Sequence, residues 1–173
     1  LFNFEGDIYL FDVATVVTKR VTNTREEEKE ADFSPDAKWV SFVRGNDLYV
    51  IDLTKYGEKQ LTRDGKEGDK PIYNGYLDWV YEEELYGRGD FQAHWWSPTS
   101  GTVAFLSLDE APVREFTVVD HVPEGFLDTE RAVVAEVTNY PKAGDPNPLA
   151  RLSIAHLADK RIVAVDLSSF PPD

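Results

Sequence analysis

The sequence feature that most constrains the fold is an internal repeat built around the dipeptide Ser-Pro. Residues 31–36 (Ala-Asp-Phe-Ser-Pro-Asp) precede an apolar run at 39–42, and residues 94–99 (His-Trp-Trp-Ser-Pro-Thr) precede another at 103–105. In each copy an aromatic residue ends one expected strand, Ser-Pro begins a turn, and a second strand follows. Repeated antiparallel units of this kind are typical of the blades of a β-propeller.

A second echo relates residues 7–12 (Asp-Ile-Tyr-Leu-Phe-Asp) to residues 47–52 (Asp-Leu-Tyr-Val-Ile-Asp). Residues 47–52 are expected to form a β-hairpin with residues 39–43. Its turn, at residues 44–46, contains Gly and Asn, and this is the clearest hairpin in the sequence. No apolar stripe of helical period is sustained. We therefore predict an all-β fold, a partial β-propeller of antiparallel four-stranded blades. A β-sandwich with coincidental Ser-Pro turns is the alternative.

The repeat predicts how the chain is divided. Both ends look cut, so we expect a fragment of one propeller domain. Residues 1–30 would end one blade, residues 31–62 would form a complete blade, and residues 93–166 would form a second. Two stretches are left over: residues 71–90 join the blades, and residues 110–148 interrupt the second. The expected strands lie near 31–33, 39–44, 47–52, 59–62, 93–96, 103–108, 150–156 and 162–165.

Composition excludes several classes of function. The 18 Lys and Arg against 32 Asp and Glu give a net charge of −14, which argues against nucleic acid and anionic membranes. No apolar run approaches the roughly 20 residues of a membrane span. The chain has no Cys, its three His are widely separated, and no Asp-rich calcium loop occurs. We expect no metal and no cofactor.

Two runs of three glutamates differ in their neighbours. Residues 26–28 lie among charged and polar residues, so we expect a solvated turn between strands. Residues 82–84 lie among apolar side chains, so part of the run must lie against apolar surface. Burying a carboxylate is costly unless a cation or a donor meets it. Residues 82–84 therefore have two possible interpretations: a ligand-binding site, or an ordinary run of charged residues exposed to solvent.

Several uncommon motifs now occur together in one order. Tyr-Asn-Gly-x-x-Asp-Trp-Val-Tyr-Glu-Glu-Glu begins at Tyr73, Trp-Trp-Ser-Pro follows at Trp95, and Tyr-Pro-Lys-Ala-Gly follows at Tyr140, with Asn-Pro at Asn147. Over most of residues 30–166 the chain resembles the N-terminal propeller domain of dipeptidyl peptidase IV, a serine peptidase of the prolyl oligopeptidase class. The resemblance implies a parent exopeptidase that releases dipeptides with Pro or Ala in the penultimate position.

The resemblance also implies roles for the glutamate motif. The motif would lie on a short helical segment, where Glu83 and Glu84 bind the α-ammonium of a peptide substrate. Asp78, Trp79, Tyr81 and Glu82 would support the motif. An ammonium group offers three donors and no acceptor, so two carboxylates suit it.

The chemistry of hydrolysis is not expected in this chain. Gly-x-Ser-x-Gly, the motif around the nucleophile of α/β-hydrolases, is absent. We therefore predict no catalytic residue here and expect a C-terminal α/β-hydrolase domain of the parent chain as a partner. The family's arginine that binds the substrate carbonyl has no position we can assign. The alternative function is a non-enzymatic propeller scaffold that binds another protein.

The long interruption at residues 110–148 contains β-branched runs at 115–119 and 132–137, which predict a β-hairpin arm. The resemblance implies that the arm pairs two subunits in a dimer; a loosely packed flap is the alternative. Trp95 and Trp96 are expected in the core of a blade. The lack of Cys fits a bacterial chain, and the resemblance implies a periplasmic or other extracytoplasmic location.

Overall fold

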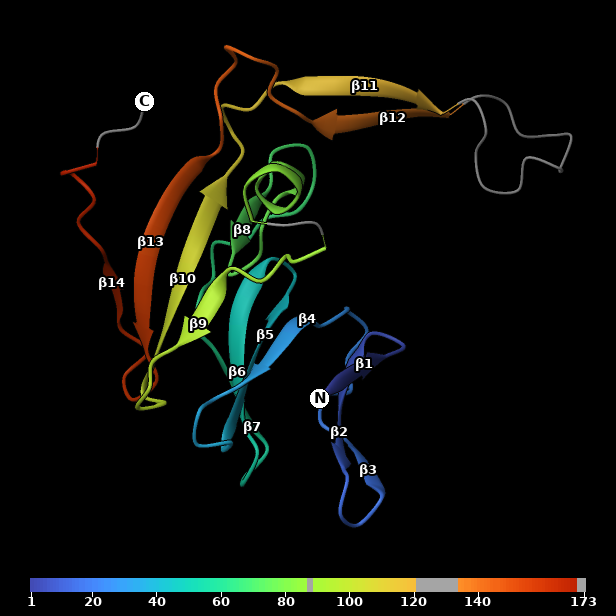
Figure 1. Cartoon of the computed structure of the whole chain (residues 1–173), viewed down its shortest axis with the longest axis vertical. Coiled ribbons are helices and arrows are strands. Elements are labelled where there is room, and N and C mark those ends of the chain that lie inside the picture. The colour runs from blue at the N-terminus through green and yellow to red at the C-terminus, as the bar shows by residue number, and fades with distance from the viewer. Residues whose placement is uncertain (87–88, 121–133, 171–173) are drawn as a thin grey trace, which may run out of the picture.

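The computed structural model describes residues 1–86, 89–120 and 134–170, and its sheets lie side by side in chain order (Figure 1). The first sheet contains β1 (Phe2–Phe4), β2 (Asp7–Asp12) and β3 (Val17–Arg20). The second sheet contains β4 (Lys29–Phe33), β5 (Trp39–Arg44), β6 (Asp47–Asp52) and β7 (Gly57–Gln60).

The third sheet has five strands, and the arm extends from it (Figure 1). Its strands are β8 (Ile72–Asn74), β9 (His94–Trp96), β10 (Thr102–Asp109), β13 (Leu149–His156) and β14 (Ile162–Ala164). The arm is the antiparallel pair β11 (Glu115–Asp120) and β12 (Val134–Asn139). All pairings are antiparallel, so the all-β prediction and the hairpin arm are confirmed. Residues 121–133, which join the two runs of the predicted arm, lie outside the described residues.

The expected strands agree closely with the observed ones. Those predicted within residues 31–62 are β4 to β7, and those predicted within 93–166 are β9, β10, β13 and β14. β8 was not predicted as a strand. The assignment of residues 1–30, 31–62 and 93–166 to successive blades stays a prediction.

The Ser-Pro repeat recurs because each serine closes the same turn. The Ser34 hydroxyl accepts a hydrogen bond from the Trp39 amide at 3.0 Å, and the Ser97 hydroxyl accepts one from the Thr102 amide at 3.2 Å. Each hydroxyl thus pins the start of the strand that follows. A local side-chain acceptor of this type favours a turn over continued pairing.

The second sheet is buried on both faces, with one core cluster on each side of it. Alternate residues of a strand point to opposite faces. Val43 and Val50 therefore pack toward the third sheet, whereas Phe42 and Ile51 pack toward the first. This central position explains why β5 and β6 are almost continuously apolar.

The prediction of a solvated turn around residues 26–28 is wrong for Glu28. Its side chain is completely buried and accepts hydrogen bonds from Thr22 at 2.8 Å and Thr24 at 2.6 Å. Arg44 forms an ion pair with it at 3.2 Å. The sequence does not reveal this pairing because Arg44 lies 16 residues further along the chain, at the end of β5. Glu26 and Glu27 are exposed, as expected.

Candidate functional site: the glutamate segment

The glutamate segment, defined here as residues 78–86, leaves the third sheet between two pieces of one edge. β8 and β9 lie end to end along the same side of β10. At the junction the Gly75 amide donates to the Leu106 carbonyl at 2.8 Å, and the Leu106 amide donates to the Ala93 carbonyl at 2.9 Å. The Ala93 amide donates to the Gly75 carbonyl at 3.1 Å, which closes the neck of the excursion. The segment is therefore a protrusion from a rigid sheet edge.

The segment begins at a capping aspartate. Asp78 is buried, and its Oδ1 accepts a hydrogen bond from the Tyr81 amide at 2.9 Å. Its carbonyl accepts one from the Glu82 amide at 3.0 Å. The side chain of Asp78 thereby satisfies an amide that the first turn would leave unpaired. The turn that follows, Tyr81–Tyr86, is a single π-helical turn, a geometry that is rare and often found at functional sites.

The three consecutive glutamates have different environments. Glu82 is 4% exposed and accepts a hydrogen bond from the Gly89 amide, so it folds back and holds the end of the excursion. Glu83 is half-buried, and Glu84 is exposed. The first glutamate is thus part of the structure of the segment, while the carboxylate of Glu84 reaches solvent.

Aromatic side chains support the segment from two directions. Trp79 is 47% exposed, and its ring centre lies 5.1 Å from that of Tyr140, which follows the arm. Tyr86 stacks on Trp95 of β9 with ring centres 6.4 Å apart. Trp96 packs against the core as predicted, but the prediction for Trp95 is wrong, because adjacent strand residues face opposite sides.

The surroundings of the segment are strongly acidic. Burial, together with the nearby charges of Glu30, Glu27 and Glu82, raises the pKa of Tyr76 to about 12. Burial and the charge of Asp90 also raise the pKa of Glu30. A cation would be attracted here.

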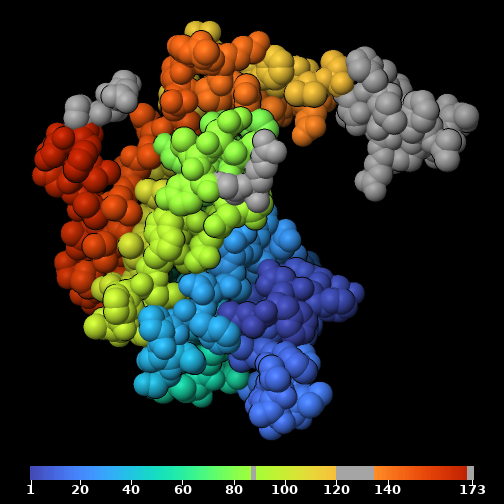
Figure 2. Space-filling model, viewed as in Figure 1, coloured from blue at the N-terminus to red at the C-terminus, as the bar shows by residue number. Residues whose placement is uncertain are grey.

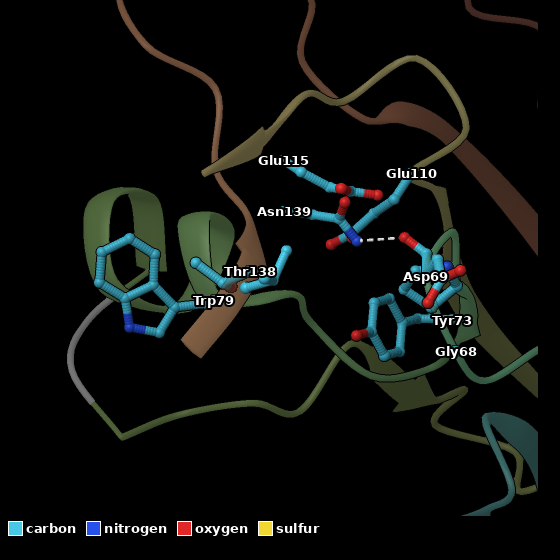
Figure 3. Close-up of a pocket in the computed structure, with 10 residues that line it drawn as sticks. Gly68, Asp69, Tyr73, Trp79, Glu110, Glu115, Thr138 and Asn139 are labelled. Carbon is cyan, nitrogen blue, oxygen red and sulfur yellow. Dashed lines mark hydrogen bonds between the residues drawn. The ribbon is translucent and has the colours of Figure 1, made fainter. Parts of the chain in front are cut away.

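A hollow of about 520 Å³ lies between the segment and the base of the arm (Figure 3). Glu110, Glu115 and Asn139 converge in it above Tyr73, and the Asn139 amide donates to the Asp69 carbonyl at 2.8 Å. Neither Glu83 nor Glu84 lines this hollow. Among the described residues no group of three or more His, Asp and Glu is arranged to hold a metal ion.

Comparison with known proteins places this architecture in a family. The sequence model of the dipeptidyl peptidase IV N-terminal region matches residues 2–173. The chain belongs to this family. It is 31% identical to a probable dipeptidyl peptidase 4 of Emericella nidulans over 98% of the chain and 21% of that protein. It is 32% identical to dipeptidyl aminopeptidase B of Saccharomyces cerevisiae over 89% of the chain and 18% of that protein.

A solved structure agrees with the sequence comparison. The crystal structure of dipeptidyl peptidase 4 from Porphyromonas gingivalis superposes with a TM-score of 0.78 at 30% identity, over 96% of this chain and 22% of that one. The predicted family and the partial-propeller fold are confirmed. The chain spans about a fifth of the length of these dipeptidyl peptidase IV relatives. None of the described helices has the length and apolarity to span a membrane.

Within this dipeptidyl peptidase IV N-terminal region, the structure brings all six residues singled out from the sequence onto one protrusion. Asp78 caps it, Tyr81 packs on the buried cluster of Leu77, Ala93 and Leu108, and Glu82 closes it. Sequence reasoning missed Glu110, whose buried side chain is hydrogen-bonded to that of Asp78. No sequence signal joins them, because Glu110 follows β10 and lies outside the motif.

Proposed function

We propose that this chain is the non-catalytic propeller part of a dipeptidyl peptidase IV-like serine exopeptidase. In this proposal Glu83 and Glu84 bind the free α-ammonium of a peptide, and a separate α/β-hydrolase domain cleaves after the second residue, which is Pro or Ala. An extracytoplasmic, periplasmic location of a bacterial enzyme completes the proposal and rests on the family resemblance.

The observation that carries the proposal is the different burial of the three glutamates on a rigid protrusion. Glu82 accepts a hydrogen bond from the Gly89 amide, and Glu83 and Glu84 follow it on a turn that is anchored at Asp78 and at the hydrogen bonds between Gly75 and Ala93. Carboxylates held in this way need little reorganisation to meet a ligand, which favours binding.

Electrostatics favours an ammonium as the ligand. Burial raises the pKa of Tyr76, and the nearby charges of Glu30, Glu27 and Glu82 raise it further, so negative charge is concentrated at the base of the protrusion. One opposite charge at about 4 Å contributes about 4 kcal/mol at an effective dielectric constant of 20, before desolvation is subtracted. Fixing the amine would fix which peptide bond reaches a nucleophile, so two carboxylates would measure a dipeptide.

We further propose that the arm pairs two subunits. Val119 and Val137 are 45% and 59% exposed. Val119 is paired with Ala135, two residues before Val137 on β12, so the two valines lie on the same face of the hairpin. Exposed β-branched residues on an isolated two-stranded ribbon favour pairing with a second copy.

The test is kinetic and uses the full-length protein that contains this chain. Glu83→Gln and Glu84→Gln should each lower kcat/KM for dipeptide substrates roughly 10- to 150-fold, because a charge-assisted hydrogen bond contributes about 1.5–3 kcal/mol. The loss should fall mainly on KM. The matched control is Glu27→Gln, which changes an exposed member of the other glutamate run and should leave KM unchanged.

A substrate with an acetylated N-terminus gives a second control. It lacks the ammonium, so the variants and the unaltered protein should cleave it equally poorly. Equal kinetic effects of Glu27→Gln and Glu84→Gln, or undiminished cleavage of the acetylated substrate, would exclude the proposed recognition of the amine.

A further inference from the structure

Asp78 and Glu110 come from separate parts of the chain and meet at the start of the glutamate segment. They are 3% and 4% exposed, and their side chains are hydrogen-bonded to each other. Ionised carboxylates only accept hydrogen bonds, so one member of such a pair must carry a proton. Two carboxyls that share one proton in this way titrate as a unit.

Each member of the pair is fixed to a different element. Asp78 caps the glutamate segment through the Tyr81 amide. Glu110 follows β10 at the point where the chain turns toward the arm; its amide donates to the Pro71 carbonyl at 3.1 Å, and its carbonyl accepts from Val113 at 3.0 Å. The shared proton thus joins the cap of the segment to the base of the arm.

Among the described residues that influence the pKa of Glu110, Lys70 is the one cation. Lys70 donates to the Asn139 Oδ1 at 3.0 Å and to the Val113 carbonyl, and its charge favours ionised Glu110. Burial and the charge of Asp78 outweigh it and raise the pKa of Glu110 to about 7. Burial also raises the pKa of Asp78.

The other neighbours add no positive charge. Tyr73 of β8 and Tyr81 of the segment face the pair, and burial together with the carboxylates raises the pKa of both, so both are neutral near pH 7. The remaining acidic neighbours, on the loop before β8 and on β11, are Glu67, Asp69 and Glu115. Ionising the pair would therefore bring two like charges together in buried surroundings.

We propose that Glu110 is a positioning residue for the glutamate segment, because the proton that it shares with Asp78 holds the cap of that segment against the base of the arm. While the proton is present the carboxyls attract each other. Once it is lost both carboxylates repel, and the cap loses its anchor. The docked position is favoured below the pKa of the pair and weakens as pH rises through about 7. Only the consequence for substrate binding rests on the proposed function.

The first measurement follows the segment without using activity. In the full-length protein labelled with 5-fluorotryptophan, the fluorine resonance of Trp79, assigned with Trp79→Phe, should shift between about pH 5.5 and 8.5 with a midpoint near 7. Glu110→Gln should abolish the shift, because an amide donates to Asp78 at every pH. Asp78→Asn, which can still cap Tyr81, should abolish it too. Glu115→Gln, an exposed carboxylate in the same hollow, should leave it intact.

The second measurement links the pair to the proposed recognition of the amine. Between pH 6 and 8 the KM of the unaltered protein should rise roughly tenfold more than the KM of Glu110→Gln, with little change in kcat, because weakened positioning removes one charge-assisted bond. A Trp79 shift with KM equal in both proteins would support positioning and count against amine recognition. A Trp79 resonance that does not titrate, or that titrates unchanged in both Glu110→Gln and Asp78→Asn, would overturn the proposal.

Discussion

The Ala93 amide donates a hydrogen bond to the Gly75 carbonyl at 3.1 Å, although the entire glutamate segment lies between these residues. Because both residues also bond to Leu106 of β10, the interrupted edge behaves as one strand from β8 to β9. In the space-filling view the segment forms the green surface between the arm and the second sheet (Figure 2). Its position is therefore set by the sheet, which makes the neck a sensitive place for mutation.

Gly75→Ala should destabilise the protein and disturb the segment. Gly75 has a φ of 79°, and a Cβ at this position would lie 3.1 Å from Leu48 and 3.3 Å from His94. The left-handed conformation alone costs about 1–2 kcal/mol for a residue with a side chain, and overpacking adds about 1–3 kcal/mol. Denaturant unfolding should show a lower midpoint. Gly68→Ala is the matched control, since φ is 98° but no atom lies within 4 Å; an equal loss in both variants would refute the role of close packing at the neck.

Arg44→Met should lower the free energy of unfolding by about 3–5 kcal/mol, because it leaves the buried carboxylate of Glu28 without its cation. Lys38→Met removes an exposed ion pair with Asp36 at 3.4 Å and should change stability by no more than about 0.5 kcal/mol.

A double-mutant cycle identifies the cause of the loss at Arg44. Glu28→Gln removes the charge but can keep bonds to Thr22 and Thr24, so adding it to Arg44→Met should restore much of the stability. Strictly additive losses would mean that Arg44 acts through its other contacts, which are the ion pair with Glu58 at 2.5 Å and the packing on Tyr49, whose ring centre lies 4.3 Å from the guanidinium.

Replacing Val119 and Val137 together with Asp should convert the proposed dimer into a monomer, because two charges would be buried in the face that pairs. Sedimentation equilibrium of the full-length protein gives the mass directly. Val13→Asp, which alters a residue 79% exposed between β2 and β3, should leave the dimer intact. A double variant that remains dimeric would show that the arm does not hold the subunits together.

Local pattern was sufficient for the strands of residues 31–62 and 93–166 and for the motif. Ser34 and Ser97 close turns with atoms of their own neighbourhood, so their repeat could be recognised before any tertiary contact was known. The run Asp78 to Glu84 likewise carries its own cap and its own apolar anchors. Residues whose partners lie within a few positions leave a readable signature.

The sequence by itself determined the antiparallel strands, the hairpin arm and the membership of the six motif residues in one segment. Only the tertiary structure decided which glutamates are buried. Glu28 is paired with Arg44 of β5, Glu82 accepts a hydrogen bond from the Gly89 amide, and Glu110 is hydrogen-bonded to Asp78 of the glutamate segment. The reason is physical: strand formation depends on periodicity along the chain, whereas the burial of a charge depends on a partner that folding brings from elsewhere.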